Sequence, residues 1–278
     1  MKTKTVLAAA LTAILGYGTN ANAVIIDLFD DPKTGDVPNF QMVQDFTNGV
    51  NPVANQYGPA TSIIGSYRDL VVDAISGASS PVTGSTLLVQ NGSLQFSNTT
   101  SANSGVDGVG VVQWDGNDAA TPGTLNPTGL GGLDLIKQEG CPVSGCDRFE
   151  AAILFADAGF EYQIGVYTDA THYSILTADT LFPVASLYTA DYLFSWFALT
   201  PGDYFLGGLP FNIAWGSDGA ANFANVGAIQ LTLNTAGTLA VDLTIDSITK
   251  TAPEPGVLAL MGIGLLGAGL TGRRKARK

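Results

Sequence analysis

Between residues 24 and 252 the chain consists of short apolar segments separated by Gly, Asn, Asp or Pro, and this pattern restricts the fold most. In Leu239–Ile245 apolar residues alternate with small or polar ones, which is typical of a strand with one buried face. Asn91-Gly92 lies between two such segments and is the strongest short hairpin signal. No window shows a capped amphipathic helix. The pattern predicts an all-β fold.

Strands without helical crossovers favour an antiparallel β-sandwich, jelly-roll-like, formed as a single domain by residues 24–252. Phe149–Phe155, Phe160–Tyr167 and Tyr173–Thr177 are expected to form a meander. Long loops are expected at Asp115–Gly132 and Thr200–Pro210, where binding residues would lie. The other expected strands are Val24–Phe29, Ser62–Tyr67, Leu70–Ile75, Leu87–Gln90, Ser93–Ser97, Val109–Trp114, Tyr192–Leu199, Ala228–Leu233 and Leu239–Ile245.

The first 23 residues have the three parts of a secretory signal peptide. Lys2 and Lys4 form a basic region, and an apolar segment follows at Val6–Tyr17. Ala21-Asn22-Ala23 is a small-residue cleavage site, so the mature chain is expected to begin at Val24. The sequence therefore predicts export through the Sec translocon.

The last 26 residues also have three parts in a fixed order. Pro253-Glu254-Pro255 cannot continue a helix and predicts an extended, protease-accessible joint. The uncharged run 256–272 would make a helix of roughly 26 Å, which is a short transmembrane span. The basic tail 273–278 should stay on the cytoplasmic side, which places the preceding domain outside.

This order of parts resembles the PEP-CTERM sorting signal of exported bacterial proteins, and the resemblance covers residues 253–278. It implies recognition and cleavage near Pro253, Glu254 and Pro255 by an exosortase-type membrane peptidase. It also implies a Gram-negative bacterium that makes extracellular polysaccharide. A plain C-terminal membrane anchor is the alternative.

The body of the chain is strongly acidic. The whole chain has 12 basic and 24 acidic residues, for a net charge of −12. Seven of the bases lie in the two ends, so residues 24–252 hold 23 acids against five bases. Such a surface repels nucleic acid and offers no basic patch to bind it. We therefore expect no nucleic-acid partner.

The sequence contains no catalytic motif of a serine hydrolase elbow, zinc protease or P-loop type. His172, the only histidine, lies between Thr171 and Tyr173 in a predicted hairpin, where an exposed turn residue is expected. A glycosidase needs only two carboxylates, and a body with 23 acids leaves that route open. The chain is expected not to be an enzyme, with a secreted polysaccharide-active hydrolase using paired carboxylates as the alternative.

The segment Trp114-Asp115-Gly116-Asn117-Asp118 is the most suggestive site. Trp114 could stack on a sugar ring, while Asp115 and Asn117 could bind its hydroxyls. Asp115, Asn117 and Asp118 could instead hold Ca²⁺ through oxygen atoms, although no Glu completes an EF-hand loop. Turn formation explains the same residues without a ligand. No other cofactor is expected. Asp30, Asp31 and Asp36 form a second, weaker oxygen cluster.

Cys141 and Cys146 are the only cysteines, and four residues separate them. In an exported chain they are expected to form one disulfide that closes a small loop. A metal site would need more ligands, and a thioredoxin-like motif has two intervening residues. So short a loop would contribute little to global stability.

The body also loosely resembles the jelly-roll domain of many PEP-CTERM proteins, through the segments Phe223–Leu231 and Asp242–Asp246. This loose resemblance does not identify an activity. The sorting signal at residues 253–278 implies an inner-membrane-anchored precursor, which we expect to become a cell-surface or biofilm-matrix protein with exopolysaccharide as its partner. It does not indicate whether the mature protein stays attached or is released.

Overall fold

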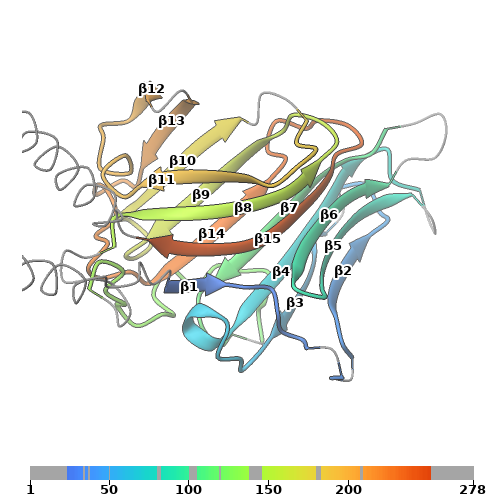
Figure 1. The fold of residues 1–278 in the computed structure, drawn as a ribbon, viewed down its shortest axis with the longest axis horizontal. Coiled ribbons are helices and arrows are strands. Elements are labelled where there is room, and N and C mark those ends of the chain that lie inside the picture. Colours follow the sequence, from blue (N-terminus) through green and yellow to red (C-terminus); the bar gives the residue numbers. More distant parts are fainter. Residues whose placement is uncertain are drawn as a thin grey trace, which may run out of the picture.

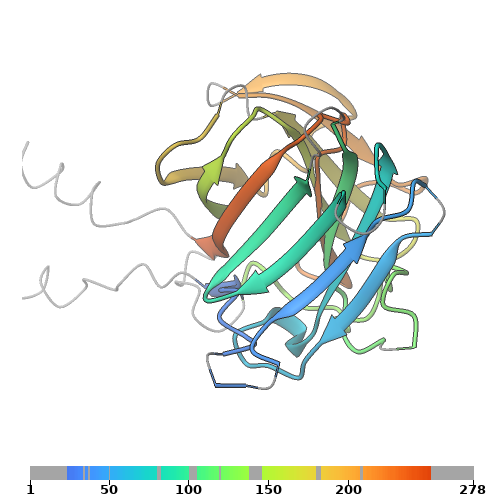
Figure 2. The same ribbon diagram turned by 90° about the vertical axis from the view of Figure 1, so that its right-hand side faces the viewer.

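The computed structural model describes residues 24–33, 35–36, 38–49, 51–79, 83–99, 105–118, 120–137, 146–179, 183–206 and 209–251. These residues form two antiparallel β-sheets that pack face to face (Figure 1, Figure 2). The predicted antiparallel β-sandwich is confirmed. The described residues contain no helix long and apolar enough to cross a bilayer. The predicted signal peptide and C-terminal span lie outside these residues and stay predictions.

One sheet has seven strands. Six follow the order β11-β8-β15-β6-β5-β2, and β1 pairs with β15 beside this path. The strands are β1 (Val24–Asp27), β2 (Gln41–Asp45), β5 (Gly84–Gln90), β6 (Ser93–Thr99), β8 (Arg148–Ala156), β11 (Tyr188–Leu193) and β15 (Asp242–Thr251).

The other sheet has eight strands in the order β12-β13-β10-β9-β14-β7-β4-β3. The chain changes sheet repeatedly, for example from β4 to β5, from β6 to β7 and from β7 to β8, as in a jelly roll. The strands are β3 (Val53–Tyr57), β4 (Arg68–Ser76), β7 (Asp107–Trp114), β9 (Glu161–Tyr167), β10 (Tyr173–Asp179), β12 (Gly202–Leu206), β13 (Leu209–Trp215) and β14 (Ala228–Leu233). A short 3₁₀ helix, η1 (Ile64–Ser66), precedes β4.

The turn chemistry predicted two connections correctly. Asn91 and Gly92 have φ values of 53° and 76°, the left-handed backbone of a two-residue hairpin turn, and join β5 to β6. The turn after Tyr167 likewise joins β9 to β10. The expected three-strand meander is wrong in its first step, because β8 and β9 belong to different sheets.

Several predicted strand boundaries are also wrong. Ser62–Tyr67 is not a strand, because Gly65 and Ser66 have φ values of 68° and 69° and form η1 instead. The strand predicted at Tyr192–Leu199 ends at Leu193. The loop expected at Thr200–Pro210 contains β12 and the start of β13. The last predicted strand begins only at Asp242, after Ala240 with φ 58°.

The core lies between the two sheets and is filled by aliphatic and aromatic side chains. Phe149 and Phe194 meet edge to face, with ring centroids 4.9 Å apart. The sheets approach closely at Gly110 of β7, where an added Cβ would lie 2.8 Å from the ring of Phe96. A side chain at that position would force the sheets apart.

A buried ion pair crosses the core near the N-terminal strand. Arg68 and Asp27 are both fully buried, and Nη1 of Arg68 lies 2.9 and 2.8 Å from the two carboxylate oxygens of Asp27. Trp114 donates its indole N–H to Asp27 at 2.9 Å, and Gln41 accepts from Nε of Arg68 at 2.9 Å. The pair is therefore fully hydrogen-bonded, as a buried pair must be to persist.

Arg68→Met should lower the free energy of unfolding by about 3–5 kcal/mol, because it leaves the Asp27 carboxylate buried without a cation. Urea denaturation of the purified chain, followed by tryptophan fluorescence, would measure the loss. Arg148→Met is the control. Arg148 pairs with Asp147 at the partly exposed surface, where an ion pair contributes less than about 1 kcal/mol. Equal losses in the two variants would contradict the role given to Arg68.

Candidate functional site

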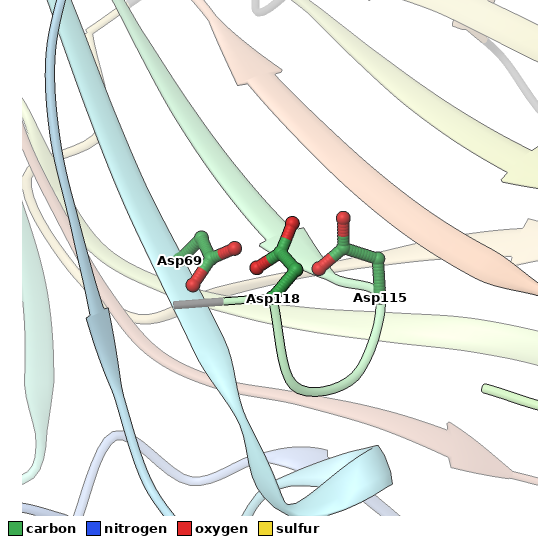
Figure 3. A group of neighbouring side chains, drawn as sticks. All are labelled: Asp69, Asp115 and Asp118. Atoms are coloured by element: carbon green, nitrogen blue, oxygen red, sulfur yellow. The ribbon is translucent and has the colours of Figure 1, made fainter. Parts of the chain in front are cut away.

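Three aspartates from two separate parts of the chain meet at the end of β7. Asp115 follows the strand directly, and Gly116, with φ 87°, turns the loop so that Asp118 comes back over β4. Asp69, the second residue of β4, lies beside Asp118 (Figure 3). One oxygen atom from each carboxylate lies within 4.8 Å of the other two. We call these three residues the aspartate cluster.

Each of the two loop carboxylates accepts a hydrogen bond through one of its two oxygens. Asn126 donates its backbone N–H to Oδ2 of Asp115 at 2.7 Å. Gln56 donates its side-chain N–H to Oδ1 of Asp118 at 2.7 Å. The opposite oxygens, Oδ1 of Asp115 and Oδ2 of Asp118, are buried and have no hydrogen-bond partner. Both oxygens of Asp69 are also buried and unpaired. The cluster therefore presents four unsatisfied carboxylate oxygens.

Burial and mutual repulsion change the pKa values of the cluster. Burial, together with the nearby Asp118 and Asp115, raises the pKa of Asp69 to about 8. Burial also raises the pKa of Asp115 to about 6, against the opposing effect of the Asn126 N–H. None of the ion pairs between described residues involves the cluster. Protons or a bound cation must therefore supply the missing positive charge.

The structure brings together two of the three residues proposed as calcium ligands. Asp115 and Asp118 are in the cluster, but Asn117 is exposed and is not part of it. Sequence reasoning missed Asp69, which comes from a strand 46 residues before Asp115. The signal that could have revealed Asp69 was its position in β4, where a carboxylate interrupts a buried apolar strand.

The proposed sugar-stacking role of Trp114 does not agree with the structure. Its side chain is only 1% exposed, points into the core and donates its indole N–H to Asp27. Asp115 is also only 1% exposed, so neither residue offers a surface to a sugar. Trp114 is a core residue because the alternation of β7 places it on the inner face.

The weaker oxygen cluster at Asp30, Asp31 and Asp36 is not brought together. Asp31 accepts from Ser62, while Asp36 accepts the backbone N–H of Lys33. Among the described residues, only the aspartate cluster gathers three potential metal ligands.

The remaining predicted positions have different outcomes. His172 is in the turn before β10, as expected, where its Nδ1 lies 3.0 Å from Oδ2 of Asp169.

Cys146 is buried and is not a free cysteine, but Cys141 lies outside the described residues, so the disulfide stays a prediction. The sorting triplet Pro253, Glu254 and Pro255 and the cleavage residues Ala21 and Ala23 also lie outside them.

A ladder of polar side chains crosses the outer face of the eight-stranded sheet. Strand register places its five members opposite one another on adjacent strands. Their neighbours along the strands, such as Ile164 and Leu176, are buried in the core, so the ladder faces outward. Four steps between strands give it a length of roughly 19 Å. Its members are Thr232, Gln163, Thr177, Asn212 and Asp203.

A groove of about 270 Å³ lies at one end of this polar ladder. It is lined by Thr177, Asn212 and Asp203 of the ladder, and by Glu161 and Asp179. Glu161 and Asp179 are opposite each other in the β9–β10 pair. Burial and Glu161 raise the pKa of Asp179. The groove therefore combines hydrogen-bonding side chains with a pair of carboxylates.

Residues 251–275 match the PEP-CTERM protein-sorting motif. The chain carries this sorting motif. Such a motif implies an exported protein that is sorted by an exosortase-type peptidase through a membrane-anchored precursor of Gram-negative bacteria. No curated protein matches the chain significantly in sequence.

Two solved structures give weak matches to this chain. "Structure of PfGH50B" gives a TM-score of 0.34 at 13% identity, over 61% of this chain and 21% of that one. The family 11 carbohydrate-binding module from Clostridium thermocellum, in complex with a β-1,3-1,4-mixed-linked tetrasaccharide, gives 0.33 at 11% identity. That match covers 77% of this chain and 95% of the module. These scores are too low to transfer a ligand or an activity.

With divalent cations removed by a chelator, Asp69→Asn should stabilise the fold by about 1–3 kcal/mol at pH 8 and much less at pH 4. The pKa of Asp69 is about 8 in the fold, above its ordinary value of 3.8. The fold favours the protonated Asp69 carboxyl, so this stabilisation of the folded state is fully present below pH 3.8 and is lost as the pH rises through 8. Urea denaturation at both pH values would measure the difference.

The exposed residue Asp246 of β15 gives the control variant, Asp246→Asn, which should show no such dependence on pH. If the stability of Asp69→Asn varied with pH in parallel with the wild type, Asp69 would not be the group responsible.

Proposed function

We propose that this PEP-CTERM protein is a non-enzymatic component of the cell surface or extracellular matrix, and that its β-sandwich binds exopolysaccharide. The observation that carries the proposal is the sorting motif at residues 251–275, which implies export and exosortase processing. The predicted signal peptide, with cleavage before Val24, supports the same route. The acidic body favours a soluble, displayed domain over one bound to nucleic acid.

The two ends of the described domain support release by proteolysis. β1 begins at Val24 and β15 ends at Thr251, and these strands pair with Val24 opposite Lys250. The predicted signal cleavage and the sorting triplet therefore lie just outside one strand pair. Cutting at both places would leave every described strand complete.

The polar ladder is the proposed binding surface. Amide, hydroxyl and carboxylate groups in a row offer donors and acceptors to successive sugar hydroxyls. Beside it on the same face, Tyr167 and Tyr173 form a ring pair with centroids 5.3 Å apart. Aromatic rings next to polar side chains suit a sugar, which has both apolar and hydroxyl-bearing surfaces. A chain of sugars would lie across the strands, along the ladder.

One observation favours the alternative of a secreted hydrolase. Glu161 and Asp179 line an open groove, and the raised pKa of Asp179 is what a general acid requires. The aspartate cluster does not support this alternative, because Asp69 and Asp115 are 0% and 1% exposed and a sugar bond cannot reach them.

Replacing Pro253, Glu254 and Pro255 together by alanine should leave the protein in the inner membrane with its tail uncut. Wild type should instead yield a mature product that begins at Val24 and lacks Lys278. Cell fractionation and intact mass would distinguish these products, with Pro201→Ala as the control. A wild-type protein that keeps Lys278 and stays in the inner membrane would mean that the tail is a plain anchor.

The double variant Gln163→Ala, Thr177→Ala should bind purified exopolysaccharide from the bacterium that makes this protein about tenfold more weakly. The reason is that it removes one or two hydrogen bonds to the polysaccharide. The matched control is Gln95→Ala, Thr244→Ala. Gln95 and Thr244 are also cross-strand neighbours, but they lie on the outer face of the seven-stranded sheet. Titration calorimetry would measure both affinities, and equal weakening would exclude the ladder as the binding surface.

The same polysaccharide distinguishes binding from hydrolysis. No release of reducing ends is expected from the wild type. Release that disappears in Asp179→Asn and in Glu161→Gln would establish the hydrolase and overturn the non-enzymatic proposal.

A further inference from the structure

We propose that Asp69, Asp115 and Asp118 form a binding site for a divalent cation, with Ca²⁺ as the preferred ion. The ion would join β4 to the loop that follows β7. This inference goes beyond the proposed function, because it holds whatever ligand the outer face binds.

The strongest support comes from Asp69. This side chain is 0% exposed, and neither of its carboxylate oxygens has a hydrogen-bond partner. Figure 3 shows it beside Asp118, which lies between it and Asp115 on the loop that follows β7. A buried carboxylate with no partner is costly, so a fold that keeps one normally supplies an ion or a proton at that place.

The loop carboxylates are oriented in the way that metal ligands usually are. Asn126 and Gln56 each bind one oxygen and leave the other oxygen buried without a hydrogen-bond partner. Gln56 also donates to the carbonyl of Gly116 at 3.1 Å, which fixes the turn between the two aspartates. Such outer contacts hold a ligand in place before the ion arrives.

The described residues do not place a cationic side chain in an ion pair with the cluster. Arg68 is next to Asp69 in sequence, but strand alternation directs it to the opposite face, where it binds Asp27. No ion pair between described residues reaches the cluster. An external cation can therefore neutralise several negative charges at once.

The donor atoms indicate the kind of cation. All three ligands are carboxylates, which suit Ca²⁺, Mg²⁺ or Mn²⁺ and not the softer metals that prefer histidine and cysteine. Ca²⁺ accepts six to eight oxygens in irregular geometry, whereas Mg²⁺ demands a regular octahedron. Gln113, opposite Asp69 in register, adds a buried and unpaired Oε1 nearby. The irregular oxygen set favours Ca²⁺, with water completing its shell.

A cation here would stabilise the loop as well as the cluster. The loop returns past Asp115 so closely that a Cβ on Gly129 would lie 1.6 Å from the Asp115 carbonyl oxygen. Leu130 then donates its N–H to Gly227 at 2.8 Å, just before β14. The hydrogen bond thus fixes the loop at Leu130, and the ion would connect its start, at Asp115 and Asp118, to β4.

The experiment uses the full-length chain, purified in a nonionic detergent and stripped with EDTA. Titration calorimetry should show one Ca²⁺ bound per chain. At a Ca²⁺ concentration about a hundred times its dissociation constant, the Tm should rise by about 5–10 °C. Mg²⁺ at the same concentration should give a smaller shift.

Asp118→Asn is the first variant. The side chain keeps an oxygen that can accept from Gln56, but it loses its charge, so Ca²⁺ affinity should fall at least tenfold. The matched control is Asp73→Asn on the same strand and face as Asp69. Asp73 also has a buried unpaired oxygen, yet it is not in the cluster. This control should retain the calcium-dependent rise in Tm.

Two results would overturn the proposal. One is a wild-type chain that shows neither binding heat nor a rise in Tm with Ca²⁺, a result that needs no variant. The other is an equal calcium affinity in Asp118→Asn and Asp73→Asn. If Asp118→Asn does not fold, Asp69→Asn takes its place with the same expected loss.

Discussion

The buried ion pair between Asp27 and Arg68 is the contact on which the sandwich depends most. It joins β1 of the seven-stranded sheet to β4 of the eight-stranded sheet across the core. Every group of the pair has a further partner, including the indole of Trp114 and the amide of Gln41. That complete bonding offsets the cost of removing two charges from water. It also fixes β4 in one register, because a one-residue slip would turn Arg68 out of the core.

The register of β4 has a consequence on the other face of the sheet. Because successive side chains alternate, an inward Arg68 requires an outward Asp69, and the arginine cannot neutralise its neighbour. The loop after β7 then buries Asp69 beneath Asp115 and Asp118. The interior obtains its positive charge from the chain itself, whereas the outer cluster needs protons or an ion from solution. Extracellular modules bind Ca²⁺ at about 10⁻⁴–10⁻³ M, which fits a protein that functions outside the cell.

Local signals in the sequence were sufficient for the fold class but not for its pairings. The Asn91-Gly92 turn was predictable because its backbone needs positive φ at both residues. β2, β3 and β12 were missed, since their residues are too polar or too irregular to show alternation. β13 was missed although Phe211 and Ile213 alternate with Asn212 and Ala214. Asp115 and Asp118 were predictable as neighbours in one loop. Asp69 was not, because its approach depends on pairing between strands far apart in sequence.

The pairing of β1 with β15 explains how processing and folding can be compatible. The PEP-CTERM match begins at Thr251, the last residue of β15, so the domain ends where the sorting motif starts. Asp147 donates its N–H to the carbonyl of Thr251 at 3.0 Å, which fixes the strand up to its last residue. β15 lies between β8 and β6 in the sheet, and this position resists fraying. A peptidase that cuts at the predicted triplet would act just beyond a strand that is paired on both sides, so cleavage there would leave the described domain intact.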